Sequence, residues 1–266
     1  FLTKSLVKST RDIRVDHIVL LDNDQQKLKT YGEISRELSR RLDPDLTFEV
    51  TSDARAALTG VDYIITTIRA GGDAGRLFDE QTCLAHGVLG QETTGAGGFA
   101  MAIRSVPTLV YYCTLAREVA NPGHLIFNFT NPSGIITQAL RSKGFDNVYG
   151  ICDAPSGFIK QLEEILEIPY GTLDIECYGL NHLSWFRNAK VNGRDVQREL
   201  LDNPRTYEHS EMRLFTREMA RISGDCMLNE YLYFYYRRVK SLSMIQKADH
   251  PRGEMIYLIN RELEEQ

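Results

Sequence analysis

Short apolar runs and longer amphipathic segments alternate along the first 150 residues of the chain. The apolar runs are rich in β-branched residues, which is typical of buried strands. They predict strands at residues 17–21, 47–50, 61–67, 125–129 and 148–151. Between them, apolar residues recur at helical spacing, which predicts helices at residues 2–9, 27–41, 55–58, 99–119 and 133–141. This alternation predicts an α/β fold with a Rossmann-like, mostly parallel sheet covered on both faces.

Two stretches of this half are less regular. The Gly-rich stretch at residues 71–98 follows the third strand, and we assign no helix or strand to it. Pro107 lies inside the longest predicted helix, and we expect it to kink or interrupt that helix.

The pattern changes after residue 150. Residues 175–178 and 185–196 look like antiparallel strands, with Asn192-Gly193 as a hairpin turn. Residues 208–264 are expected to be helical and polar. We therefore expect a domain with a dinucleotide fold at residues 1–150 and a second, α+β domain at residues 151–266. No Pro- or Ser-rich linker separates them, so the two domains are expected to share an interface.

Composition and charge exclude several classes of protein. The 266 residues have a net charge of −5, which is not the electrostatic footprint of a protein that binds nucleic acid or an anionic membrane. No stretch approaches the roughly 18 to 20 consecutive apolar residues of a membrane span. The 5 cysteines are scattered without a C-x-x-C pair, so we expect a reduced, cytoplasmic compartment. The start does not resemble a signal peptide, and it opens without Met inside a predicted helix, so we interpret the chain as a fragment.

Several polar residues follow predicted strands. Asp22 ends the first strand, where an acid can accept hydrogen bonds from the ribose of a dinucleotide, although Asp22 or Asn23 could equally cap the next helix. The glycine-rich phosphate loop that would favour the ribose role is missing. Thr130-Asn131-Pro132 follows another strand, where Asn131 and free helix amides could hold a polar ligand or simply cap the helix.

Cys152-Asp153 and Asn181-His182 also follow predicted strands. One thiolate and one imidazole suit a borderline-soft divalent metal, whereas a lone cysteine and a lone histidine are more often core residues.

Two further groups of residues admit both a functional and a structural interpretation. Arg69, Arg76 and Arg104 flank the Gly-rich stretch, where they could grip a phosphate or carboxylate or simply be solvated. The tyrosines between Tyr231 and Tyr236 could form a packing face, or one of them could act as a base beside a cation.

Seven segments occur in one recognisable order. The first covers residues 71–80, with GG at 71–72, R at 76 and DE at 79–80. The other six are GQETTGAGG at 90–98, NFTNPSG at 128–134, GICDAP at 150–155, GLNH at 179–182, YL at 231–232 and RGE at 252–254. In this order the chain resembles the family 4 glycoside hydrolases, which need a nicotinamide cofactor and a divalent metal.

The resemblance implies roles in catalysis. Cys152 and His182 would be ligands of a divalent metal, usually manganese. Tyr231 would abstract a proton, and Asp153 matches the general acid of members that cleave α-glycosides. The family is an exception to two-carboxylate hydrolysis. NAD takes hydride from carbon 3 of the sugar, the proton on carbon 2 is removed, the glycosidic oxygen leaves, water adds, and hydride returns.

The resemblance also implies roles in binding: residues 1–150 would form an NAD-binding domain, and residues 151–266 would form a catalytic domain that binds metal and substrate. Arg76 and Asn131 would hold the substrate, and Arg252 would meet the sugar phosphate. Asp22, Thr130 and Asn131 would contact NAD. The implied substrate is a phosphorylated disaccharide or glycoside, and the implied assembly is a homodimer or homotetramer.

Some features depart from the family. The first strand and its Gly-rich loop are missing, the spacing from His182 to Tyr231 is short, and C-terminal helices are missing, so we expect the full protein to be longer. Segments 128–134 and 179–182 resemble the 6-phospho-β-glucosidase branch, which we favour. Alternatives are an α-specific 6-phosphoglucosidase or α-galactosidase, a lactate or malate dehydrogenase-like oxidoreductase, and a non-catalytic sugar- or nucleotide-sensing domain.

Overall fold

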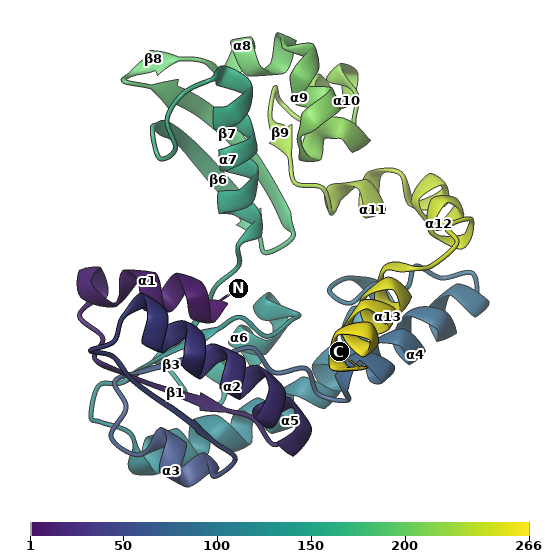
Figure 1. The fold of residues 1–266 in the computed structure, drawn as a ribbon. Coiled ribbons are helices and arrows are strands. Elements are labelled where there is room, and N and C mark those ends of the chain that lie inside the picture. Colours follow the sequence, from purple (N-terminus) through teal and green to yellow (C-terminus); the bar gives the residue numbers. More distant parts are fainter. Residues whose placement is uncertain (1, 266) are drawn as a thin grey trace.

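Parallel strands and helices alternate through the first half of the chain (Figure 1). The computed structural model describes residues 2–265. In chain order the first half consists of α1 (Leu2–Ile13), β1 (His17–Leu21), α2 (Gln25–Leu42), β2 (Thr47–Thr51), α3 (Ala54–Leu58), β3 (Tyr63–Thr66), α4 (Gly72–Ala85), α5 (Gly95–Val119), β4 (Leu125–Asn128), α6 (Ser133–Ser142) and β5 (Val148–Gly150). Every strand and helix predicted for this half is present, with ends shifted by a few residues.

Helix α4 lies in the Gly-rich stretch to which the sequence assigns no element. Its buried positions include Arg76, Asp79 and Glu80, so the face that it turns inward is charged rather than apolar. A hydrophobic pattern cannot reveal a helix of this kind, because its inward side chains are paired ions.

Helix α5 continues through Pro107 to Val119 without a break, so the interruption expected there is wrong. The helix packs against α3, α4 and α6. Its buried residues Met101, Leu109 and Cys113 provide packing that offsets the hydrogen bond lost at the proline.

The same helix α5 is, among the described residues, the one helix long and apolar enough to cross a membrane. Leu109, Cys113 and Ala116 of α5 belong to the core cluster of the first half, together with Ile126 of β4 and Leu140 of α6. A helix in the core of a fold passes the same test of length and hydropathy.

The strands of the first half form two parallel sheets. β1 pairs with β2 in register from His17↔Thr47 onward, and the second sheet has the order β3-β4-β5. A cavity of about 800 Å³ lies between β1 and β3 and is lined by residues of both strands, Leu20 and Ile65 among them. The parallel pairing confirms the Rossmann-like α/β class.

The second half is built around an antiparallel hairpin. Its elements are α7 (Ala154–Leu166), β6 (Leu173–Leu180), β7 (Leu183–Val191), β8 (Arg194–Asp195), α8 (Gln197–Asp202), α9 (Pro204–His209), the 3₁₀ helix η1 (Glu211–Leu214), α10 (Arg217–Ile222), β9 (Met227–Leu228), α11 (Leu232–Tyr236), α12 (Arg238–Gln246) and α13 (Arg252–Glu265). The predicted turn at Asn192-Gly193 joins β7 to β8, and both residues have the positive φ that a tight hairpin requires (51° and 80°).

The expectation that residues 208–264 are polar is wrong for the part that covers the hairpin. Met212, Leu228 and Leu232 are fully buried there, and β9 adds a short strand to β7. They join a second core cluster in which the rings of Phe158 and Phe186 meet edge to face at 4.9 Å.

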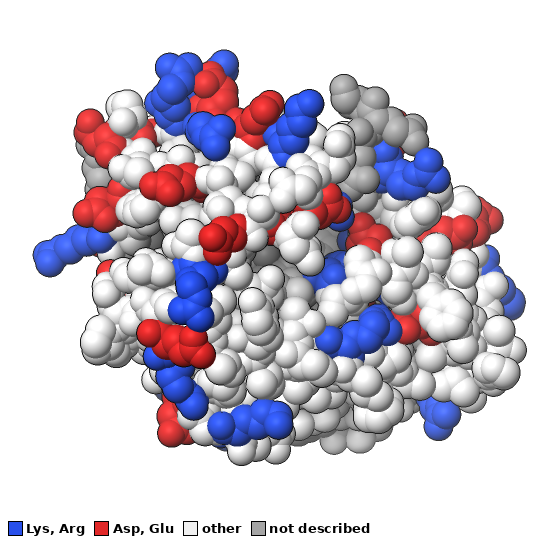
Figure 2. All heavy atoms as spheres, turned by 90° about the horizontal axis from the view of Figure 1, so that it is seen from below, with Lys and Arg blue, Asp and Glu red and all other residues white. Residues whose placement is uncertain are grey.

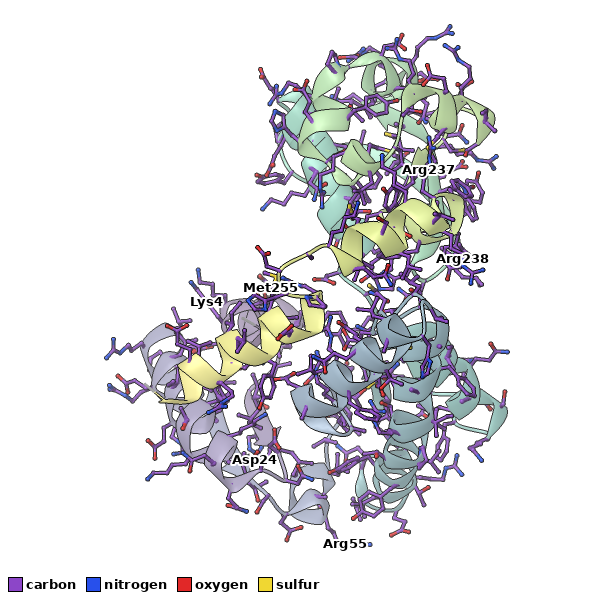
Figure 3. The ribbon with its side chains drawn as sticks, turned by 90° about the vertical axis from the view of Figure 1, so that its right-hand side faces the viewer. Lys4, Asp24, Arg55, Arg237, Arg238 and Met255 are labelled. Atoms are coloured by element: carbon purple, nitrogen blue, oxygen red, sulfur yellow. The ribbon has the colours of Figure 1, made fainter. Side chains whose placement is uncertain are left out.

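The last helix, α13, is not part of this second cluster and packs on α4 of the first half (Figure 1). Helix α12, which starts at Arg238, leads to it, and Met255 on α13 lies beyond that connection (Figure 3). Separate apolar clusters lie on either side of residue 150, but α13 of the second half packs on α4 of the first half. The domain boundary at residue 150 therefore stays a prediction.

Charged side chains are mixed on the face shown in Figure 2. Lys and Arg are interspersed with Asp and Glu there, without a continuous patch of one sign. The expectation that no nucleic acid binds stays a prediction.

Replacing Phe158 by Ala should lower the free energy of unfolding by about 3 to 5 kcal/mol, because it removes a fully buried ring and leaves a cavity beside Phe186. Urea denaturation would measure this. The control is Phe99→Ala, where the side chain is 65% exposed and the change should stay within about 0.5 kcal/mol. Equal losses for the two variants would contradict the assignment of Phe158 to the core.

Candidate active site

Cys152, His182 and Tyr231 come from three distant parts of the chain and meet at one point. Cys152 lies just beyond the end of β5, His182 lies in the turn between β6 and β7, and Tyr231 precedes α11. Cys152 Sγ is 3.5 Å from His182 Nε2, and the rings of His182 and Tyr231 have centroids 3.9 Å apart. The sequence singles out all three residues, and the structure brings them together.

The β6–β7 turn that presents His182 depends on Gly179. Gly179 has a φ of +117°, and a Cβ at this position would lie 2.3 Å from the carbonyl oxygen of Leu183. His182 itself has a φ of 59°, a left-handed conformation that costs a non-glycine residue free energy. The tight turn therefore aims the imidazole at Cys152.

The donor atoms of Cys152 and His182 fit a metal ion that is completed by other ligands. Ligands bound at about 2.3 Å through sulfur and about 2.1 Å through nitrogen, at a near-tetrahedral angle, lie roughly 3.6 Å apart. Burial lowers the pKa of His182, which favours the neutral imidazole that binds metals. Its Nδ1 is buried without a hydrogen-bond partner in the described part of the chain. Within residues 2–265 no third His, Cys, Asp or Glu joins them as a metal-binding group, so water or substrate would complete the coordination.

Tyr231 is largely enclosed. Burial raises the pKa of its phenol to about 12, the nearby Glu230 carboxylate adds to this, and the side chains of Gln91 and Thr93 oppose it. Both of these residues belong to the Gly-rich loop after α4, so this loop lies beside the phenol. Among the neighbouring tyrosines, Tyr233 packs against Phe215 in the core, as a packing face would require.

Asp153 begins α7 beside the candidate metal ligands. Its carboxylate is exposed, and it opposes the fall in the pKa of His182, which shows that the two groups interact electrostatically. A proton donor at this position would face solvent and the imidazole together.

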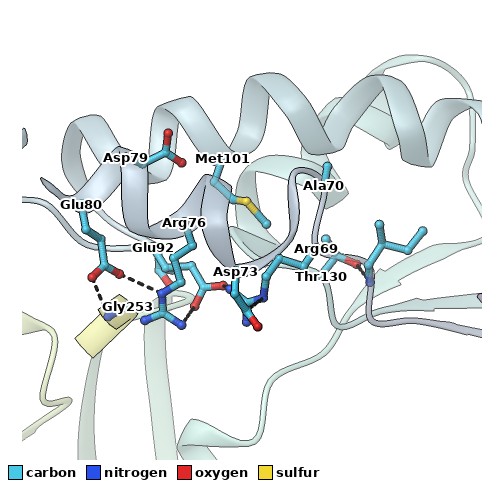
Figure 4. Close-up of polar contacts among 12 residues, drawn as sticks. Arg69, Ala70, Asp73, Arg76, Asp79, Glu80, Glu92, Met101, Thr130 and Gly253 are labelled. Carbon is cyan, nitrogen blue, oxygen red and sulfur yellow. Dashed lines mark hydrogen bonds and ion pairs between the residues drawn. The ribbon is translucent and has the colours of Figure 1, made fainter. Parts of the chain in front are cut away.

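Arg76 is not a solvated charge. It is 5% exposed, and its Nε and Nη1 pair with Glu80 Oε1 at 2.8 Å and Glu92 Oε2 at 3.0 Å (Figure 4). Arg69 also pairs with Glu92 and, at 3.3 Å, with Asp73. Glu80 and Glu92, which hold these arginines, lie in the matching segments 79–80 and 90–98, but the sequence does not predict this pairing, although Glu80 lies one helical turn after Arg76.

Glu92 connects this ion-pair network to the cluster around His182. Its carboxylate opposes the fall in the pKa of His182 that burial causes and adds to the rise in the pKa of Tyr231, in addition to pairing with Arg76. Arg104, the third arginine of the region, makes a two-pronged contact with Asp79 and donates to the carbonyl of Ala70.

Glu80 links α4 to the start of α13. Its Oε2 accepts a hydrogen bond from Gly253 N at 2.8 Å while its Oε1 holds Arg76 (Figure 4). A Cβ on Gly253 would lie 2.6 Å from the same carboxylate. Arg252, the exposed first residue of α13, directly precedes this contact.

The remaining candidates line the ends of strands. Asp22 lines the cavity between β1 and β3, and its Oδ1 accepts from Asp24 N at 2.9 Å. Asp24 caps α2, so the alternative that Asp22 or Asn23 is the cap is wrong. Thr130 is buried and accepts from Ile68 N at 2.9 Å, which ties the ends of β3 and β4 together. Asn131 follows it, partly buried, where α6 begins.

Arg76→Ala should destabilise the chain by about 3 to 5 kcal/mol, because Glu80 and Glu92 would lose the cation between them. Denaturant unfolding would measure this loss. Arg205→Ala is the matched control, since Arg205 pairs with Glu167 at the surface and its loss should cost at most about 1 kcal/mol. If Arg76→Ala were as mild as the control, the network would not be the structural element described above.

Sequence comparison identifies relatives of both halves. The model of the "Family 4 glycosyl hydrolase" family matches residues 2–168, and that of the "Family 4 glycosyl hydrolase C-terminal domain" matches residues 177–266. The 6-phospho-beta-glucosidase BglT of Thermotoga maritima is 35% identical over 204 residues, which cover 76% of this chain and 48% of that protein. The chain thus spans about half the length of the curated relatives that it matches.

Two solved structures share the fold over almost the whole chain. The 6-phospho-beta glucosidase from Thermotoga maritima, with NAD and glucose-6-phosphate, superposes with a TM-score of 0.88 at 30% identity, over 99% of this chain and 62% of that one. A 6-phospho-alpha-glucosidase from gut microorganisms, in complex with NAD and Mn²⁺, gives a TM-score of 0.87 at 26% identity, over 98% and 63%.

Proposed function

Because the chain belongs to family 4 of the glycosyl hydrolases, we propose that the protein hydrolyses 6-phospho-β-glucosides, with NAD and a divalent metal ion such as Mn²⁺ as cofactors. The observation that carries this proposal is the meeting of Cys152, His182 and Tyr231. The thiol and the neutral imidazole can bind a metal ion, and the phenol can accept a proton, as redox-elimination chemistry requires. These groups are not the pair of carboxylates that other glycosidases use for hydrolysis.

The cofactors supply what the side chains cannot: bound NAD accepts and returns a hydride, and a divalent cation stabilises negative charge on a ketone oxygen. Cys152 and His182 would hold the cation. The phenol oxygen of Tyr231 would take the proton from carbon 2 of the sugar. Asp153 would give a proton to the departing glycosidic oxygen.

Binding falls to residues around this cluster. Arg252 would bind the sugar phosphate by charge-assisted hydrogen bonds, and Asn131 would hold sugar hydroxyls and NAD. Arg76 is held by two carboxylates through Nε and Nη1, so a contact with the substrate would fall to Nη2. Asp22 would accept hydrogen bonds from the ribose of NAD. Thr130 would contribute at the end of β4.

An α-specific 6-phosphoglucosidase is the second candidate, and Asp153 is the residue that favours it. An exposed carboxyl group directly after the metal cysteine can protonate an axial leaving group from the solvent side. We still favour the β-specific activity, because segments 128–134 and 179–182 match that branch. An α-galactosidase is a further possibility within the family.

Other classes are separated by product analysis. A lactate or malate dehydrogenase-like enzyme would form net NADH from a hydroxy acid, whereas a glycosidase of this type regenerates its NAD. A sensing domain would bind sugar or nucleotide without turnover. The cytoplasmic location and a homodimer or homotetramer stay predictions.

A panel of α- and β-linked nitrophenyl 6-phosphoglucosides and 6-phosphogalactosides should show release of nitrophenol from the β-glucoside, and only with both NAD and Mn²⁺ present. A chelator, or Cys152→Ser, should abolish the activity, because a hydroxyl is a poor replacement for a thiolate ligand. Faster release from the α-glucoside would select the second candidate. Full activity of Cys152→Ser in the presence of chelator would refute the metal site.

Tyr231→Phe should leave folding nearly unchanged and lower turnover by about 10² to 10⁴, because it removes only the phenol oxygen. Carbon 2 of the product should gain solvent deuterium with the unaltered protein, and this exchange should be lost in the variant while hydride transfer to NAD persists. Mass spectrometry and NADH absorbance measure the two steps. Undiminished exchange in Tyr231→Phe would assign the proton abstraction to another residue.

A further inference from the structure

The backbone before α11 is anchored by Asn229. This residue is 1% exposed, and its Oδ1 accepts a hydrogen bond from Tyr231 N at 3.1 Å. Its own backbone N–H donates to the carbonyl of Ser184 on β7 at 3.1 Å. Asn229 therefore ties Tyr231 to the strand that follows His182.

Asn229 is in turn held by a buried carboxylate. Glu211, 6% exposed at the start of η1, accepts hydrogen bonds at the single atom Oε2 from Asn229 Nδ2 at 3.0 Å and from Glu230 N at 2.9 Å. Its backbone N–H donates to Gln161 on α7 at 2.9 Å. One carboxylate oxygen thus fixes the two residues that come directly before Tyr231.

From this chain of contacts we propose that Glu211 and Asn229 are positioning residues, which hold the Tyr231 ring against His182 so that its oxygen faces the candidate metal site. The proposal rests on the proposed function for the role of Tyr231. The placement of the ring can be tested by itself, because the 3.9 Å separation of the Tyr231 and His182 rings does not depend on any reaction.

The cost of Glu211 supports this role. Burial raises the pKa of its carboxyl group to about 7, the carboxylate of Glu230 adds to the rise, and Arg213 and the hydrogen bonds from Glu230 N and Asn229 oppose it. A charge in such a place is expensive, and an apolar side chain of similar size would pack more favourably. In return, the Glu211 carboxylate accepts hydrogen bonds from two N–H groups that would otherwise be buried without partners.

The protonation state of Glu211 also affects the strength of this anchor. The groups that interact with its charge are Glu230, Arg213 and Cys177, whose pKa Glu211 helps to raise. An ionised carboxylate accepts N–H groups more strongly than a protonated one. The anchor should therefore weaken as the pH falls through about 7, and Glu211→Gln should remove this dependence.

The chain offers a matched control in Glu163. It is 2% exposed, and its Oε1 likewise accepts from two backbone N–H groups, Thr172 N at 2.9 Å and Leu173 N at 3.0 Å. These donors join α7 to β6 and not to Tyr231. Glu163→Ala thus removes an equivalent set of hydrogen bonds from the same half of the protein.

The test combines NMR with kinetics. The metal-free protein with labelled histidine gives the ring-current shift of the His182 protons, with Tyr231→Leu as the reference without an aromatic neighbour. Turnover and KM are measured on the 6-phospho-β-glucoside with NAD and Mn²⁺. We expect Glu211→Ala to lose most of the ring-current shift and to lower turnover on the order of 10²-fold with little change in KM. Glu211→Gln, which keeps an acceptor oxygen, should retain both, and so should Glu163→Ala.

The outcomes are decisive in either direction. A folded Glu211→Ala protein that retains the shift, or a Glu163→Ala protein that loses turnover to the same extent, overturns the proposal. If Glu211→Ala does not fold, Asn229→Ser is used instead, because it removes the side-chain amide that donates a hydrogen bond to Glu211. Asn229→Ser must then reduce the ring-current shift for the proposal to stand. Loss of the shift in a protein that has no activity on any 6-phosphoglucoside refutes the proposed function but leaves the positioning role intact.

Discussion

The parallel pairing of β4 with β5 is the constraint on which the site depends. Asn128 lies opposite Gly150 in this ladder, so the residues that follow the two strands leave the same edge of the sheet together. Asn131 and Cys152, which follow β4 and β5, therefore lie at the same edge of the sheet. The hairpin of the second half then needs to supply only one turn, with His182 at its tip, to complete a donor pair.

Buried charge is the second theme of the molecule. Arg76, Glu80 and Glu92 replace what would be an apolar interface between α4, the Gly-rich loop and α13. Such pairs contribute little net stability compared with apolar packing, but they are highly directional. The directional contacts tie together elements that carry residues of the candidate site.

The sequence predicts the strands of the first half because each is a short β-branched run, and it predicts Cys152 and His182 because each follows a strand. Other features depend on tertiary contacts that have no local signal. Helix α4 is invisible to hydrophobic periodicity because its inward face is ionic. The polar description of the last sixty or so residues fails because Met212 and Leu228 are buried by a hairpin distant in sequence.

The hydrogen bond between Gly253 and Glu80 closes a loop of 173 residues. Contacts between residues so far apart along the chain form late, because the chain entropy of the whole intervening segment must be lost first. Each apolar cluster draws on one half of the chain. We therefore expect both clusters to collapse before the Glu80–Gly253 bond forms, so that α13 docks on α4 late in folding.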